Sequence, residues 1–178
     1  MQKFYVAVLV TICSLLLPAR AEAEEVFLGG SFQGVGTPFT YYADEHGANI
    51  QFGVRGKPET GLSFIGKPSL YVLGSISVDG YTNIIASGLS WKFGDKVYIR
   101  PGIGLALHDR NAVRSGPNRI RTDLGSPILF EPEIAVGTRL SERMSAELSW
   151  VHVSHAQLLS GQNPGLDMMG IRIIWKTH

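Results

Sequence analysis

Charged and aliphatic side chains alternate along several segments of this chain. In residues 97–108, for example, Ile99, Ile103 and Leu105 alternate with Arg100 and with small residues. Successive side chains of a strand point to opposite faces, so such a segment is expected to form a strand with one aliphatic and one polar face. Further charges fall on the polar faces of later segments: Glu131, Glu133, Glu147 and Arg172. Buried charges destabilise a dry globular core. The pattern therefore favours a membrane barrel, with charges paired inside and aliphatic residues facing lipid, over a lipocalin-like soluble barrel.

Turn-forming residues divide the chain into about eight strands, which is typical of an all-β chain built from hairpins. We expect an eight-stranded antiparallel outer-membrane β-barrel with strands at 25–32, 48–55, 67–78, 83–93, 97–108, 128–138, 144–155 and 167–175. An even number of strands places both termini in the periplasm. The periplasmic turns are then 56–66, 94–96 and 140–143, and the extracellular loops are 33–47, 79–82, 109–127 and 156–166.

The N-terminus has the pattern of a cleavable signal peptide. Lys3 is followed by an apolar run over 6–17 and by the small-x-small sequence Ala21-Glu22-Ala23. We therefore expect residues 1–23 to be a signal peptide that exports a single barrel domain, 24–178, to the outer membrane of a Gram-negative cell. The only cysteine, Cys13, lies within this segment, so no disulfide is expected. The formal net charge is only +1, so nothing in the overall charge suggests nucleic acid as a partner.

The segment 149–155 contains a candidate base and nucleophile, His152 and Ser154. They are two residues apart, so in a strand they share one face, and it is the aliphatic face. Asp167 shares that face if the last two strands pair. Of two possible registers, we prefer the one that sets His152 opposite Asp167, because it also sets Glu147 opposite Arg172 inside the barrel. A Ser-His-Asp triad would then form on the exterior.

Each of these residues also has a structural interpretation. A serine near a strand end or a histidine at a membrane interface is common, and Asp167 could simply begin a strand after a turn at 163–165. A metal site with His155 is not expected, because adjacent strand residues face opposite ways. The long loop holds a basic cluster that could meet phosphates or be solvated: His108, Arg110, Arg114, Arg119 and Arg121.

The second half of the chain resembles the PagL-type lipid A 3-O-deacylases, also called acyloxyacyl hydrolases. The segments that carry the resemblance are Pro101-Gly102-Ile103-Gly104 with His108, Leu124-Gly125-Ser126, Phe130-Glu131-Pro132-Glu133, Trp150-Val151-His152-Val153-Ser154 and Asn163-Pro164-Gly165-Leu166-Asp167. The likeness extends over residues 97–175 and is strongest in the last thirty or so residues.

The resemblance implies a membrane-embedded serine esterase that removes the acyl chain at position 3 of lipid A in lipopolysaccharide, without a metal or organic cofactor. By position, Ser154 is the nucleophile, His152 the general base and Asp167 the acid. Asn163 matches the family asparagine that donates to the oxyanion, and a backbone N–H near Gln157 would be the second donor. A homodimer is also compatible with the resemblance.

Three departures from the family pattern keep other functions open. His155 stands where the family usually has Asn, Asp167 replaces Glu, and the spacing from histidine to acid is one residue longer. The alternatives are an inactive member of the family, a structural or adhesive barrel without activity, and a different lipid-directed enzyme such as a phospholipase or acyltransferase.

Overall fold

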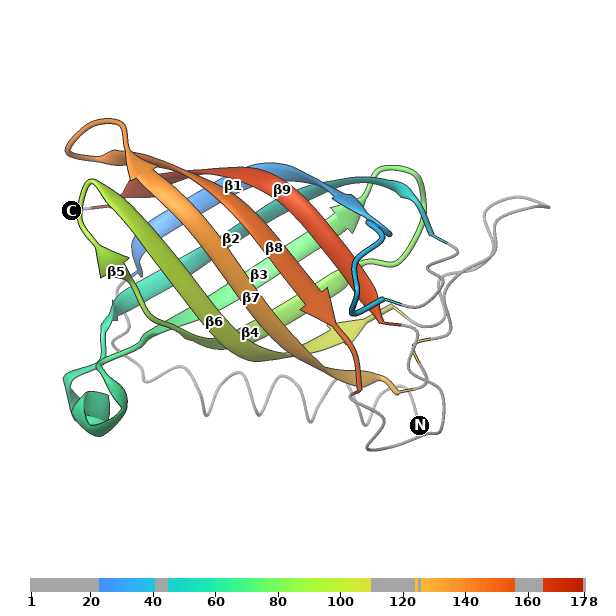
Figure 1. Cartoon of the computed structure of the whole chain (residues 1–178), viewed down its shortest axis with the longest axis horizontal. Coiled ribbons are helices and arrows are strands. Elements are labelled where there is room, and N and C mark those ends of the chain that lie inside the picture. The colour runs from blue at the N-terminus through green and yellow to red at the C-terminus, as the bar shows by residue number, and fades with distance from the viewer. Residues whose placement is uncertain (1–22, 41–44, 110–123, 125, 156–164, 178) are drawn as a thin grey trace.

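The computed structural model describes residues 23–40, 45–109, 124, 126–155 and 165–177, and these form a closed antiparallel β-barrel (Figure 1). Its strands are β1 (Ala23–Gln33), β2 (Gly47–Pro58), β3 (Ser69–Ser77), β4 (Ile84–Ser90), β5 (Phe93–Gly94), β6 (Val97–His108), β7 (Ile128–Arg139), β8 (Met144–Val153) and β9 (Leu166–Lys176). Neighbours in the sheet follow the order β4-β3-β2-β1-β9-β8-β7-β6-β5, and pairing of β4 with β6 closes the barrel. The predicted fold class is confirmed.

The fourth expected strand, 83–93, is divided into β4 and the two-residue strand β5. β4 and β5 pair with β6 in the same register, so β5 continues the line of β4. The interruption lies at Trp91, whose N–H donates to the Pro101 carbonyl at 2.9 Å. Pro101 has no N–H to return, so the ladder loses a hydrogen bond at this point.

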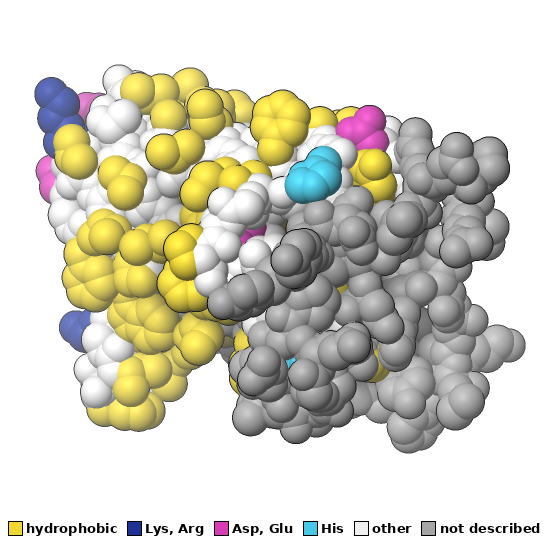
Figure 2. All heavy atoms as spheres, turned by 45° about the vertical axis from the view of Figure 1, so that its right-hand side comes forward, with side chains coloured by type: hydrophobic (Ala, Val, Ile, Leu, Met, Phe, Trp, Pro, Cys, Tyr) yellow, Lys and Arg dark blue, Asp and Glu magenta, His cyan; other side chains and the backbone are white. Residues whose placement is uncertain are grey.

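The exterior of the barrel is aliphatic and aromatic, as the alternation predicts. Large apolar side chains from many strands are at least half exposed, among them Phe32, Ile103, Val136, Leu148 and Ile171. Figure 2 shows hydrophobic side chains over most of the described surface on one face, with charged groups towards the ends of the barrel. This surface suits the hydrocarbon region of a membrane.

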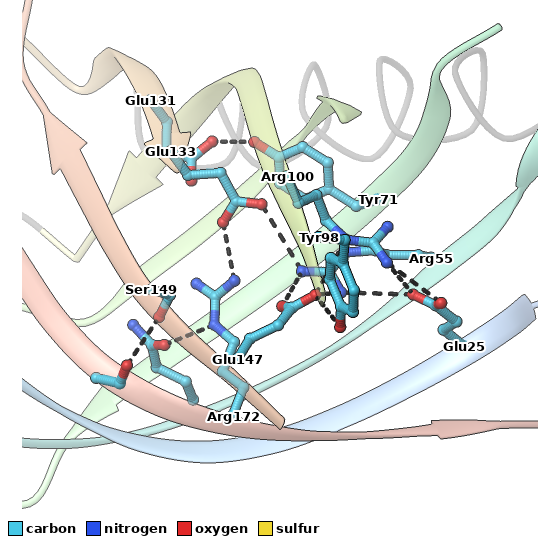
Figure 3. A network of polar contacts seen from close by, with 12 residues as sticks. Glu25, Arg55, Tyr71, Tyr98, Arg100, Glu131, Glu133, Glu147, Ser149 and Arg172 are labelled. Atoms are coloured by element: carbon cyan, nitrogen blue, oxygen red, sulfur yellow. Dashed lines mark hydrogen bonds and ion pairs between the residues drawn. The ribbon is translucent and has the colours of Figure 1, made fainter. Parts of the chain in front are cut away.

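The barrel interior holds a network of charges (Figure 3). Glu147 lies opposite Arg172 in the β8–β9 ladder, which is the predicted register. Its side-chain ion pairs go instead to Arg55 and Arg100, each at 3.0 Å, while Arg172 pairs with Glu133 at 2.9 Å. The interior of an eight-stranded barrel is narrow, so a long side chain reaches partners across it as easily as its neighbour in the ladder.

The two ends of the barrel differ. At the end where β1 begins and β9 ends, here called the turn end, the connection between β2 and β3 forms the 3₁₀ helix η1 (Thr60–Ile65). The Trp91 indole donates to the Ile65 carbonyl at 2.7 Å and holds this long turn against β4. At the opposite end, here called the loop end, β1 and β8 end and β9 begins. Among the described residues, helices capable of spanning a bilayer are absent.

Candidate active site on the barrel exterior

The hairpin of β8 and β9 brings His152 and Asp167 together at the loop end. They are direct partners in the ladder, and Nδ1 of His152 lies 2.8 Å from Oδ1 of Asp167. This is the register preferred from the sequence. An ionised carboxylate only accepts hydrogen bonds, so Nδ1 donates, and in the neutral ring Nε2 is then free of its proton and can act as a base.

Inward-facing neighbours hold this register in place. Val151, Val153, Leu166 and Met168 alternate with the site residues and are 0–1% exposed. A slip of either strand by one residue would move its two apolar residues to the exterior and would bring its polar site residues inside. The apolar layer beneath the site therefore fixes which side chains face outward.

Ser154 continues β8 by one residue and lies on the same side of the wall as His152. Its N–H and carbonyl both bond to Phe130 of β7, at 3.1 and 2.7 Å. Because the ladder continues through Ser154, strand alternation places its side chain on the exterior, about 6.5 Å along the strand from His152. In the described residues, Ser154 and His152 are not joined by a hydrogen bond. Hydrogen bonds of this kind often form only when substrate is bound.

Asp167 is on the exterior side of the wall but is covered by protein, with 0% of its surface exposed. Its Oδ1 accepts from His152 and from the Trp150 indole, the latter at 2.9 Å. Its Oδ2 accepts from the hydroxyls of Thr37 and Thr40. Four donors thus surround one buried carboxylate, as a buried charge requires.

Aromatic rings border the imidazole. Trp150 stacks on His152 with ring centroids 6.0 Å apart, and Phe39 approaches Trp150 at 5.6 Å and His152 at 6.3 Å. Phe39 is 63% exposed and so extends the apolar exterior over the site. The imidazole therefore has an aromatic, apolar surrounding on this side.

Gly165 lies directly against the imidazole. Its φ is +62°, and a Cβ at this position would be 2.8 Å from Cε1 and 3.4 Å from Nε2 of His152. The backbone at residue 165 can therefore pass the histidine only because this residue has no side chain.

Sequence reasoning missed Thr37, Phe39 and Thr40. They were assigned to an extracellular loop without a role, although Thr37-Pro38-Phe39-Thr40 has the proline expected at the second position of a turn. Only the pairing of the first strand, β1, with the last, β9, brings this loop beside Asp167.

The structure does not place several other predicted residues beside this site. Asn163 and Gln157 lie outside the described residues, as do the four arginines of the long loop. Nε2 of His108 lies 2.8 Å from the Ser126 carbonyl, and His155 is buried. In the described ranges, no cluster of three or more His, Cys, Asp or Glu side chains could hold a metal ion.

Comparisons with known proteins bear on the family and the fold of this chain. The sequence profile described as "Lipid A 3-O-deacylase (PagL)" matches residues 36–176. The crystal structure of the outer membrane enzyme PagL superposes with a TM-score of 0.58 at 16% identity, covering 85% of this chain and 98% of that one. Two further structures each reach a TM-score of 0.49. A de novo designed transmembrane β-barrel is 11% identical and covers 88% of this chain and 98% of its own. The N-terminal β-barrel domain of Pseudomonas aeruginosa OprF is 10% identical and covers 86% of this chain and 98% of its own. The search of curated proteins gave no match.

Proposed function

Because this chain belongs to the PagL lipid A 3-O-deacylase family, we propose that it hydrolyses the ester that holds the 3-O-linked acyl chain of lipid A. The observation that carries the proposal is the hydrogen-bonded pair of His152 and Asp167 on the exterior of the barrel wall. A hydrolytic site on this face of the wall is on the side of a substrate that lies in the membrane. A water-soluble substrate would not reach a site on the lipid-facing surface.

The chemistry assigned to these residues is acyl transfer through serine. Ser154 Oγ attacks the ester carbonyl carbon while Nε2 of His152 takes its proton. The bond from the carbonyl carbon to the sugar oxygen then breaks, and Nε2 returns the proton to that oxygen, which leaves an acyl group on Ser154. Water attacks the acyl group with the same base, the fatty acid departs and Ser154 regains its proton.

Asp167 holds the imidazole in the tautomer that this cycle needs. In the proposal, the Asn163 amide and a backbone N–H near Gln157 donate to the oxyanion. No cofactor is needed for these steps.

The acyl chain has an apolar surface to lie on. In the β8–β9 ladder, Trp150 pairs with Met169 and Leu148 with Ile171. Met169 is 44% exposed, Leu148 63% and Ile171 60%. These side chains run along the barrel from the site toward the turn end and form a continuous apolar track.

The proposed orientation places the turn end in the periplasm and the loop end at the cell surface, so that the site meets the outer leaflet. Residues 1–23 act as the cleaved signal peptide in this proposal. We also propose that the protein forms a homodimer in the membrane.

The test is mass spectrometry of lipid A from Gram-negative cells that make the protein, beside the same cells with an empty vector. We expect the loss of one 3-hydroxyacyl chain from lipid A only where the protein is present. Purified protein is then incubated with lipopolysaccharide or with phospholipid. Unchanged lipid A would refute the proposal, and acyl release from phospholipid alone would identify a phospholipase.

Replacing Gly165 with alanine is expected to lower turnover about 10- to 100-fold while the barrel still folds. The new Cβ would displace the imidazole, and misplacement by about 1 Å can cost two orders of magnitude in rate. Gly61→Ala is the matched control, because a Cβ there meets nothing within 4 Å. Equal turnover in the two variants would show that the close approach of Gly165 to His152 has no part in catalysis.

A further inference from the structure

The segment that follows β1, residues 34–40, holds Asp167 by hydrogen bonds to both its backbone and its side chain. The N–H groups of Gly34 and Val35 donate to the Asp167 carbonyl at 2.9 and 3.3 Å. The hydroxyls of Thr37 and Thr40 donate to its carboxylate. Four hydrogen bonds therefore join this segment to one site residue.

A tight turn aims both hydroxyls at one oxygen. The Thr40 N–H donates to the Thr37 carbonyl at 3.2 Å, and the Phe39 N–H donates to the Thr37 hydroxyl at 3.1 Å. Because the Thr37 hydroxyl accepts from Phe39, its own proton is available for the carboxylate. Pro38, between them, has the fixed φ that the second position of such a turn favours.

The two carboxylate oxygens of Asp167 accept hydrogen bonds from different partners. Oδ2 is occupied by the two threonines, and Oδ1 by His152 and Trp150. A carboxylate has about four acceptor directions, so these four donors fill it. Rotation about the Cβ–Cγ bond would break all four hydrogen bonds at once.

We propose that Thr37 and Thr40 are positioning residues for the triad, which hold Asp167 so that Oδ1 meets Nδ1 of His152. This role rests on the proposed function, because it acts on the same triad. Neither threonine contacts the reacting atoms. Their contribution should therefore appear in kcat and leave KM unchanged.

The test compares the double variant Thr37→Val/Thr40→Val with Thr37→Ser/Thr40→Ser. Valine keeps the shape of threonine and removes the donor, whereas serine keeps the donor. For hydrolysis of lipopolysaccharide, we expect the valine variant to lose about 10- to 100-fold in kcat with KM within about twofold. The serine variant should stay within about threefold of the unmodified chain, and Thr60→Val in η1 is the control far from the site.

A second readout separates this proposal from the proposed function. A fluorophosphonate probe reacts with an activated serine whatever the natural substrate is, so its rate of attachment to Ser154 reports the triad directly. We expect that rate to fall in the valine variant and to recover in the serine variant, with the folded barrel verified by its electrophoretic mobility before and after heating.

The outcomes are distinct. Labelling of the unmodified chain without release of acyl chains from lipopolysaccharide would reject the substrate and still test the threonines through the labelling rate. Equal kcat and equal labelling in the valine variant would overturn the positioning role. Absence of labelling at Ser154 in the unmodified chain would overturn both the triad and the role of the threonines in it.

Discussion

Ser154→Ala is expected to abolish deacylation of lipid A, lowering kcat by about 10⁴-fold or more. Without the hydroxyl, no acyl-enzyme can form, and what is left is the modest rate that binding and oxyanion donors give to direct attack by water. The barrel should be unaffected, because Ser154 is fixed in the ladder by its backbone bonds to Phe130. Release of 3-hydroxy fatty acid from lipopolysaccharide by purified protein measures the effect.

Ser149→Ala is the matched control for this experiment. Ser149 lies on the same strand but on the inward face, where its hydroxyl is 3.4 Å from the Gly170 carbonyl. It should retain close to full activity at equal amounts of folded protein. Activity in Ser154→Ala comparable to that of Ser149→Ala would mean that Ser154 is not the nucleophile.

The register of the last hairpin was predictable because, of the two registers that keep the three site residues on one face, only one also sets opposite charges side by side inside the barrel. Placing His152 opposite Asp167 also sets Glu147 opposite Arg172, and both pairings occur in the ladder. The fold class was predictable because charged residues alternate with aliphatic residues along the strands, which places the charges inside the barrel and the aliphatic residues outside. Period-two alternation reports the two faces of a strand directly.

The contacts that escaped prediction join strands or loops that are far apart in the sequence. Alternation shows that Glu147 faces inward but not which arginine it meets across the barrel, and the partners are Arg55 and Arg100. Likewise, nothing in the local sequence of Thr37 and Thr40 signals a carboxylate more than a hundred residues later. Such contacts follow from closure of the barrel.

The buried charge of Glu147 should be the most sensitive point for the stability of the barrel. Its carboxylate pairs with both Arg55 and Arg100 and also accepts from the Tyr98 hydroxyl at 3.1 Å. Glu147 and Arg55 are 1% exposed and Arg100 is 2% exposed, so water cannot replace a lost partner. The variant Glu147→Gln keeps the volume of the side chain but removes the negative charge between two arginines.

We expect Glu147→Gln to lower the free energy of unfolding by about 3 kcal/mol, the lower end of the cost of breaking a buried ion pair, because Glu25 still pairs with Arg100 at 2.9 Å and with Arg55 at 3.5 Å. Asp95→Ala, which breaks the exposed pair with Arg139 at the turn end, should cost about 1 kcal/mol or less. Urea unfolding from phospholipid vesicles, followed by tryptophan fluorescence, measures both through the midpoint at an unchanged slope. If the two variants lost equal stability, the interior charges would behave as solvated groups. The barrel would then owe its stability to the strand ladder and the apolar exterior, with no net contribution from the ion pairs of Glu147.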